Sequence, residues 1–112
     1  MTKFDRRARI KYLSGIAMGI VRRCGDPCWI DRGGARSKIL SVRYNEMRIE
    51  LSHSIADDVR TLTVRFDGKT VLLVEWTPEA VTRTSYRLGA WEAALLRYDR
   101  TPALTGRIKA ET

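Results

Sequence analysis

The sequence predicts an α+β fold in which an antiparallel four-stranded sheet is flanked by an N-terminal and a C-terminal helix. Three observations carry this prediction. An apolar repeat with helical spacing lies near the N-terminus, alternating apolar and polar runs follow, and a second helical repeat lies towards the C-terminus. The chain has 112 residues, the usual size of one domain. We therefore expect a single domain, residues 1–112, with the element order α-β-β-β-β-α.

The first helix is predicted over about residues 4–24. Its apolar residues recur at spacings of three and four, which gathers them on one face at about 100° per residue. They are Ile10, Leu13, Ile16, Ala17, Ile20, Val21 and Cys24. Thr2 or Asp5 can cap the start, and Gly25 followed by Pro27 ends the helix. The apolar run at residues 28–30 is too short to classify, and residues 31–34 are interpreted as a loop.

Four alternating runs predict a sheet over about residues 37–76. Asn45-Glu46 separates the first two runs and suits a hairpin turn, because Asn tolerates a positive φ. Asp67-Gly68 separates the last two and is the strongest turn signal in the chain. The final run, residues 70–76, is apolar on both faces, which suggests a central strand or one covered on its second side. Residues 37–53 also fit helical spacing. Strands are preferred because strict alternation coincides with β-branched residues.

A second helix is predicted over about residues 78–99. Thr77-Pro78-Glu79 offers a capping hydroxyl, a proline at the first helical position and an acid near the positive end of the helix dipole. The apolar face is expected to carry Val81, Leu88, Trp91, Leu95 and Tyr98. Gly89 and residues 82–86 weaken the middle, so the pattern is clearest over residues 89–99. Residues 103–112 are expected to be a frayed basic tail.

Positive charge is concentrated in the first third of the chain. The whole sequence carries a formal net charge of +8, and residues 1–36 hold nine Lys or Arg against three Asp or Glu. Such a cluster suits an anionic partner, because each neutralised phosphate releases condensed counterions. The candidate nucleic-acid or anion-binding residues all lie on the first predicted helix: Arg6, Arg7, Arg9, Lys11, Arg22 and Arg23.

The predicted sheet adds basic residues but no exposed aromatic side chain. Arg43, Arg48 and Arg65 are expected to line its exposed face, and they would contact phosphates. The strand aromatics fall on the predicted apolar face: Tyr44, Phe66 and Trp76. Base stacking needs exposed aromatics, so binding is expected to be mainly electrostatic.

The sequence shows no catalytic set and no metal site. The single histidine, His53, lies on the apolar face of a predicted strand, and Asp57-Asp58 is interpreted as a solvated turn. Cys24 and Cys28 could supply two zinc ligands, but a closed site needs four, so they are interpreted as reduced thiols. We predict no catalytic residue, no metal and no cofactor.

These observations favour a small basic non-catalytic protein that binds an anionic surface. Nucleic acid is the preferred partner, ahead of an acidic protein. Two alternatives stay open. One is a protein-interaction module or inhibitor of a host protein from a mobile element or phage. The other is a toxin-like ribonuclease, because some ribonucleases use Arg, Lys and Tyr in place of His.

The N-terminus imitates a signal peptide, with a basic stretch before apolar residues 12–21. That run is too short to span a bilayer and is followed by Arg22-Arg23, so we expect a cytoplasmic protein with no membrane partner. Self-association as a homodimer is predicted from two features. The last strand is apolar on both faces, and the first helix has a smooth flank made by Ala8, Gly15 and Gly19.

Overall fold

The computed structural model describes residues 5–100, which form two helices and a six-stranded antiparallel sheet. The elements in chain order are α1 (Arg6–Cys24), β1 (Asp26–Arg32), β2 (Ala35–Tyr44), β3 (Met47–Ser54), β4 (Val59–Phe66), β5 (Lys69–Trp76), β6 (Val81–Tyr86) and α2 (Trp91–Asp99). Each strand pairs with the next along the chain, so the sheet is a simple meander.

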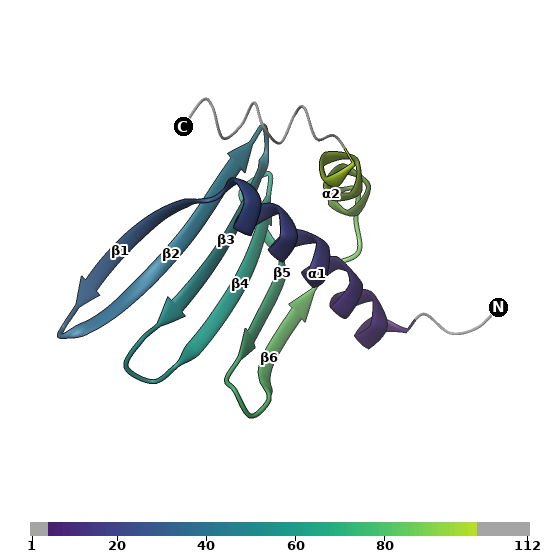
Figure 1. Ribbon diagram of the computed structural model, residues 1–112. Coiled ribbons are helices and arrows are strands. Elements are labelled where there is room, and N and C mark those ends of the chain that lie inside the picture. Colours follow the sequence, from purple (N-terminus) through teal and green to yellow (C-terminus); the bar gives the residue numbers. More distant parts are fainter. Residues whose placement is uncertain (1–4, 101–112) are drawn as a thin grey trace.

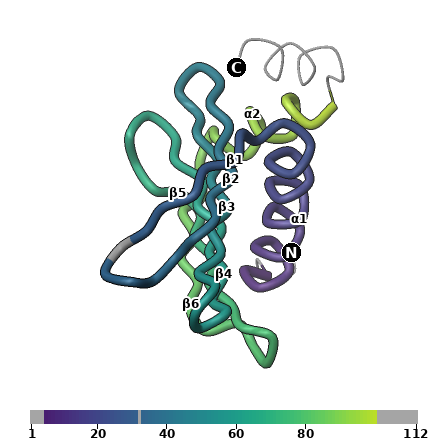
Figure 2. Tube along the Cα trace, turned by 60° about the vertical axis from the view of Figure 1, so that its left-hand side comes forward, coloured from purple at the N-terminus to yellow at the C-terminus, as the bar shows by residue number. Residues whose placement is uncertain are grey.

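Both helices lie on one face of the sheet, which we call the helix side; the opposite face is the open face. Figure 1 shows α1 crossing the strands diagonally, with α2 near one end of the sheet. Figure 2 shows the sheet nearly edge-on, with α1 along one side of it. No described helix covers the open face. The helix side is therefore the only face on which the described part of the chain builds a core.

The first helix agrees with its predicted range. The side chain of Asp5 accepts a hydrogen bond of 3.1 Å from the Ala8 backbone N–H, which satisfies one of the donors left open at a helix start. Gly25 ends the helix, and its N–H donates to the Val21 carbonyl oxygen. A Cβ at this position would collide with that same carbonyl. Only glycine allows this close approach as the chain turns into β1.

The core lies between α1, α2 and the helix side of β2 to β5. Its largest fully buried side chains include Leu13, Ile20, Ile49, Leu62, Leu72, Trp91 and Leu95. Two residues expected in the core differ. Ile16 is only partly buried, and Leu88 is 77% exposed.

The sheet has six strands, and the prediction of four was wrong at both ends. At the first end, residues 26–32 form β1 and pair with residues 35–41 of β2. Gly33 and Gly34 close this hairpin with φ values of 55° and 84°, which glycine adopts without steric cost. The expected loop at residues 31–34 is thus a strand end and a hairpin turn.

At the other end, the predicted helix over residues 78–99 is a strand followed by a shorter helix. The Thr77 hydroxyl accepts hydrogen bonds from the Glu79 and Ala80 backbone N–H groups at 3.3 and 3.4 Å, as a helix cap would. Thr77 N–H also donates to the Ala80 carbonyl oxygen, so the chain turns back and β6 pairs with β5. The β-branched residues of 81–84 then favour a strand. The helical pattern holds only from residue 91.

The hairpin signals and the strand assignment of residues 37–53 are confirmed. Asn45, Asp67 and Gly68 have φ values of 52°, 54° and 77°, as the predicted turns require. β2 and β3 cover residues 37–53, so the helical alternative was wrong. The last predicted strand is interior, between β4 and β6, which fits its two apolar faces. The expected tail at residues 103–112 lies outside the described residues. Neither described helix is long and apolar enough to cross a membrane.

Candidate functional site

The six candidate cations of α1 are divided between two flanks of the helix. On the flank that faces α2, Arg9 contacts Glu92 at 2.7 Å, and Arg23 contacts Asp99 at 3.0 Å. These two ion pairs join α1 to α2. Arg9 and Arg23 are therefore each engaged in an ion pair within the fold.

The Arg9 contact belongs to a buried network. The Glu92 side chain is only 6% exposed, and it also accepts a hydrogen bond from the Tyr86 hydroxyl. Burial raises the pKa of Tyr86, and the hydrogen bond to Glu92 raises it further. The same carboxylate raises the pKa of Arg9 through its hydrogen bond. The network keeps Arg9 charged and oriented towards α2.

The opposite flank of α1 overhangs a groove of about 910 Å³, which we call the α1 groove. Arg6, Arg7 and Lys11 line it from the helix, above apolar side chains of the sheet. Arg22 is exposed further along the helix. Within residues 5–100, none of these four cations contacts an acidic side chain. The structure thus brings three of the six predicted residues together at one groove.

A second cationic arrangement crosses the helix side of the sheet beyond α1. In five consecutive strands, β1 to β5, the residues Trp29, Lys38, His53, Arg60 and Trp76 lie directly opposite one another in register. Side chains opposite each other in adjacent strands share a face. They share the face of Val42 and Ile49, which are buried under the helices. We call this set the basic-aromatic row.

Much of the basic-aromatic row is accessible to solvent, most of all at its Trp29 end. Trp29 is 48% exposed, although it lies on the apolar side of the sheet. The side chains of Arg60 and His53 are 42% and 31% exposed. Trp76 is partly buried and also lines the α1 groove. The row therefore runs from an exposed indole ring at Trp29, past Lys38, His53 and Arg60, to a partly buried indole ring at Trp76.

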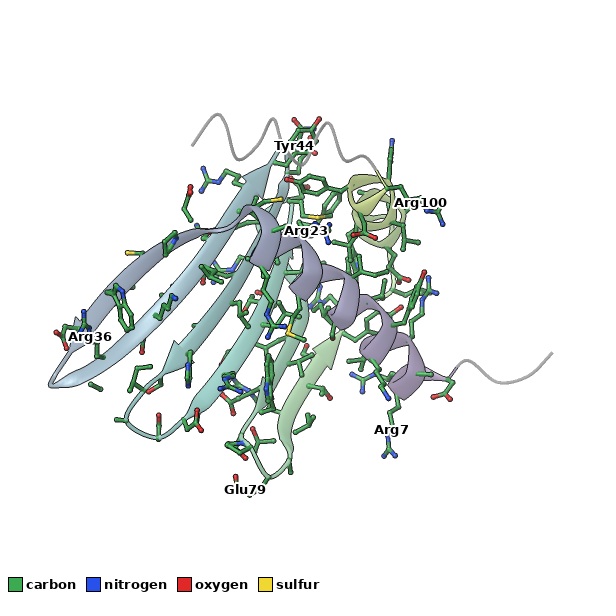
Figure 3. The ribbon with its side chains drawn as sticks, viewed as in Figure 1. Arg7, Arg23, Arg36, Tyr44, Glu79 and Arg100 are labelled. Carbon is green, nitrogen blue, oxygen red and sulfur yellow. The ribbon has the colours of Figure 1, made fainter. Side chains whose placement is uncertain are left out.

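Cation–π contacts hold the Trp29 end of the row. The Arg36 guanidinium carbon lies 4.2 Å from the Trp29 ring centroid, and Lys38 Nζ lies 5.9 Å from it. Both distances fall within the range in which the ring quadrupole attracts a cation. Arg36 lies at the outer end of the β1–β2 hairpin (Figure 3). It extends the positive surface beyond Trp29.

Asp58 orders the middle of the row. Its Oδ1 lies 2.6 Å from His53 Nε2 and 3.8 Å from an Arg60 guanidinium nitrogen. Asp58 stands in the β3–β4 turn, where its φ is 52°. In the described chain, no hydroxyl or thiol is hydrogen-bonded to His53. The pair thus resembles a base with its orienting acid but lacks a nucleophile.

The open face has a row of its own, and its predicted position is confirmed. Arg43, Arg48 and Arg65 lie directly opposite one another in β2, β3 and β4. Arg48 contacts Glu50 at 3.0 Å. We call this set the arginine row. No aromatic side chain accompanies it among the described strand residues, because those of Tyr44, Phe66 and Trp76 share the helix side.

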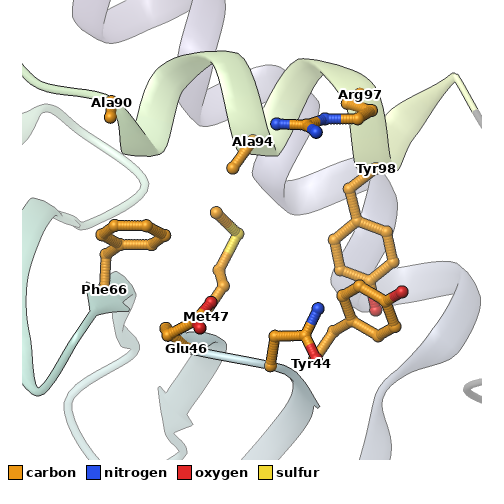
Figure 4. A pocket seen from close by; sticks show the side chains of 9 residues that line it. Tyr44, Glu46, Met47, Phe66, Ala90, Ala94, Arg97 and Tyr98 are labelled. Atoms are coloured by element: carbon orange, nitrogen blue, oxygen red, sulfur yellow. The ribbon is translucent and has the colours of Figure 1, made fainter.

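A smaller pocket of about 410 Å³ lies between α2 and the β2–β3 hairpin (Figure 4). Met47 and Phe66 contribute to it from the sheet, and Tyr98 packs against Tyr44 with the rings tilted by 35° and their centroids 5.0 Å apart. Burial raises the pKa of Tyr98, whose hydroxyl has no hydrogen-bond partner among the described residues. Glu46 and Arg97 line the pocket with opposite charges. We assign no ligand to it.

Among the described residues, neither cysteine belongs to a cluster of possible metal ligands. Cys24 is buried in the core and Cys28 is exposed on β1. Across residues 5–100, no three His, Cys, Asp or Glu side chains gather in a way that would hold a metal ion.

Sequence reasoning missed the basic-aromatic row although it named some of its members. It placed His53 and Trp76 on the apolar side of the sheet but did not recognise that they belong to a partly exposed row. It also left Trp29 outside the sheet, because the run at residues 28–30 was too short to classify. The Gly33-Gly34 pair was the signal that could have revealed the β1–β2 hairpin and aligned Trp29 with Lys38.

Comparisons with known proteins give no relative: neither a family model nor a curated protein nor a solved structure matches this chain.

Proposed function

We propose that this protein binds single-stranded nucleic acid on the basic-aromatic row. One observation carries the proposal. Trp29, which is 48% exposed, and the partly buried Trp76 border Lys38, His53 and Arg60 in register across five strands. Proteins that bind single strands combine a cationic path for the phosphates with aromatic rings on which bases stack. This row offers both on one surface.

The dimensions of the row suit a short stretch of single strand. Adjacent strands lie about 4.8 Å apart, so the Trp29 and Trp76 backbones are separated by roughly 19 Å. Such a span corresponds to a few nucleotides, at the short end of known single-strand sites. Duplex bases are stacked on one another and cannot reach the rings. We therefore expect a preference for single strands and little discrimination between sequences.

The α1 flank supports the row electrostatically. Arg6, Arg7 and Lys11 line a groove that also includes Trp76, so their charge extends the positive surface from the row to α1. They raise the local concentration of an anionic strand and its rate of association. Arg9 and Arg23 are left out of this proposal, because Glu92 and Asp99 hold them.

A titration with labelled oligonucleotides tests the proposal. Fluorescence anisotropy is measured with a mixed-sequence single strand of about twelve nucleotides at roughly 50 and 200 mM salt. Trp29→Ala should weaken binding about 5- to 150-fold, since a stacked base contributes about 1–3 kcal/mol. Lys38→Gln should lower the slope of log affinity against log salt by about 0.7, the value for one single-strand phosphate contact.

Arg43→Gln is the matched control, because it removes one positive charge from the open face. It should leave affinity nearly unchanged. Equal losses from Arg43→Gln and Lys38→Gln would mean that only net charge matters, which would contradict the row. No binding at about 50 mM salt would reject nucleic acid as the partner. Cleavage of the RNA that is lost in His53→Gln would instead support the ribonuclease alternative.

A further inference from the structure

The α1 groove has an apolar interior. Leu62, Val74 and Trp76 contribute from β4 and β5, and Ile10 and Met18 contribute from α1. A volume of about 910 Å³ lies within the range of pockets that bind ligands. Methionine adapts its shape to different occupants. The groove can therefore receive apolar side chains or an apolar chain.

Its rim is cationic and leaves polar groups unsatisfied. Arg6, Arg7 and Lys11 line the groove without an acidic partner among residues 5–100. Ser14 Oγ, also on the lining, is buried and has no hydrogen-bond partner among the described residues. Apolar walls below unpaired cations complement a ligand that is apolar on one part and acidic on another.

One wall of the groove is a free sheet edge. Val81 and Thr84 of β6 line the groove, and Val81 is 60% exposed. In the described chain β6 pairs only with β5. An unpaired edge presents backbone N–H and C=O groups that can pair with another strand. In Figure 3, Arg7 extends from the N-terminal end of α1 on the β6 side of the sheet.

The pairing pattern shows which backbone groups of β6 face outwards. Arg87 N–H donates to the Val71 carbonyl oxygen at 2.9 Å, so these opposite residues form a hydrogen-bonded pair. Bonded and non-bonded pairs alternate along an antiparallel ladder. Arg83 and Ser85 therefore direct their backbone groups towards β5, and Thr84 directs its groups to the free edge. The other outer strand, β1, carries Pro27, which cannot donate a hydrogen bond.

We propose that β6 and the α1 groove bind an extended acidic and apolar peptide segment of a partner protein by strand addition. The peptide backbone pairs with Thr84, apolar side chains at alternate positions enter the groove, and a carboxylate contacts Arg6, Arg7 or Lys11. Strand addition draws affinity from the main chain and specificity from such side-chain pockets. The proposal goes beyond nucleic-acid binding: it shares Trp76 and the α1 cations with the nucleic-acid surface but adds the free edge of β6, which that surface does not use.

The charge of the rim favours an acidic segment of another protein, in preference to a second copy of this chain, as the occupant of the β6 edge. Two copies paired through β6 would bring Arg6, Arg7 and Lys11 of both copies to the same edge, and neither β6 strand carries an acidic residue to offset that charge. The whole chain has a formal net charge of +8. Like charges on neighbouring strands are destabilising. An acidic segment would neutralise the same rim.

Hydrogen exchange on the full-length protein tests the pairing. The probe is a synthetic ten-residue peptide. Every second residue faces the groove, and these positions are occupied by valine and glutamate. The remaining positions are threonine. The peptide should slow exchange of the Thr84 amide by tenfold or more. The Arg83 and Ser85 amides, already bonded to β5, serve as internal references and should change little. A peptide with N-methylated backbone amides should not protect Thr84, because it cannot donate to the edge.

Variants of the protein test the roles of the β6 edge and of the cationic rim. Thr84→Pro removes the outward N–H without removing a ladder bond, and it should abolish binding. Lys11→Gln should weaken binding several-fold, whereas Arg22→Gln, the matched charge change on α1 outside the groove lining, should not. Trp29→Ala should leave peptide binding intact, which separates this site from the nucleic-acid surface.

Three outcomes would overturn the proposal. Equal binding of peptides with glutamine in place of glutamate would remove the acidic specificity. Thr84 protection that grows with protein concentration and needs no peptide would assign the edge to a second copy. Binding of dodecanoate to the groove with no peptide-induced protection of Thr84 would assign it to an acyl chain.

Discussion

The two ends of the helix side carry the same kinds of residue and use them differently. At the covered end, Tyr86 of β6 and Trp91 of α2 meet edge to face, and Trp91 is 2% exposed. At the uncovered end, Trp29 of the basic-aromatic row is 48% exposed and lies beneath a cation. Strand alternation decides which residues share a face. The position of the helices decides whether that face is core or surface.

The carboxylates of the two ends repeat this contrast. Glu92 contacts Arg9 and Tyr86, and its side chain is 6% exposed. Asp58 contacts His53 and Arg60, and its side chain is 47% exposed. Water screens the exposed contacts of Asp58. The buried contacts of Glu92 are stronger because their surroundings are less polar, and removing one partner there costs more free energy of folding. The covered end is thus built for stability, and the uncovered end can exchange its contacts for those of a ligand.

The largest expected effect comes from truncating one residue at each end. Leu13→Ala opens a cavity in the core under α1, where Leu13 is fully buried, and should lower the free energy of unfolding by about 2–5 kcal/mol. Trp29→Ala should cost less than about 1 kcal/mol, since its ring is half exposed. Urea denaturation followed by circular dichroism measures both. Similar losses would show that the row is part of the core.

The carboxylates give the next largest difference. Glu92→Ala should cost about 1–3 kcal/mol, because it leaves the Tyr86 hydroxyl and Arg9 without their buried partner. Asp58→Ala should cost less than about 1 kcal/mol, as expected for exposed ion pairs. The comparison needs the same denaturation experiment at low salt. A larger loss from Asp58→Ala would mean that the β3–β4 turn depends on this carboxylate for its shape.

These contrasts also show how much of the fold the sequence contains. α1, β2 to β5 and the two predicted hairpin turns follow from local signals, because Asp5, Asn45 and Gly68 each meet a steric or hydrogen-bonding need of their own position. β6 does not. Thr77 makes cap-like contacts in the structure as predicted, yet pairing with β5 turns the next residues into a strand. Such a choice depends on a neighbour that local pattern does not describe.

The candidate site was harder to predict than the fold, for a related reason. The six cations of α1 were identified by charge alone, and charge does not distinguish Arg9, held by Glu92, from Lys11, which lines the groove. The basic-aromatic row depends on register across five strands and on which part of the helix side α1 leaves uncovered. Neither feature can be predicted from the sequence until residues 26–32 are recognised as a strand.

Alkaline pH should destabilise the covered end specifically. The folded protein raises the pKa of Tyr86 and Tyr98, chiefly by burial, so each favours folding while it is neutral. That contribution is complete below the ordinary tyrosine pKa of about 10 and is lost as pH rises towards the raised value. Between about pH 10 and 12, the buried Tyr98 alone should lower stability by about 1.4 kcal/mol per pH unit.

Tyr98→Phe removes the ionisation of Tyr98. It also removes a buried hydroxyl that has no hydrogen-bond partner among the described residues. The variant should show a shallower loss of stability above pH 10 than the natural sequence does. Denaturant midpoints at several pH values provide the measurement. Tyr12→Phe is the control, since that ring is half exposed on α1. An equal change of slope in the control would place the alkaline sensitivity outside the covered end.

The open face supplies the smallest expected effect, and its sign is opposite to the others. Arg65 faces Arg48 directly across two strands, and Arg48 already contacts Glu50. Like charges in this position repel, and threonine suits a strand, so Arg65→Thr should raise stability by about 0.2–1 kcal/mol. Arg83→Thr is the matched change on the same face, where Glu75 lies 3.7 Å from the guanidinium, and it should bring no such gain. The gain at Arg65 should shrink as salt rises, because exposed charges are screened. Destabilisation by Arg65→Thr at every salt concentration would show that its aliphatic stem packs on the strands, and that this exposed face contributes to the fold as the covered end does.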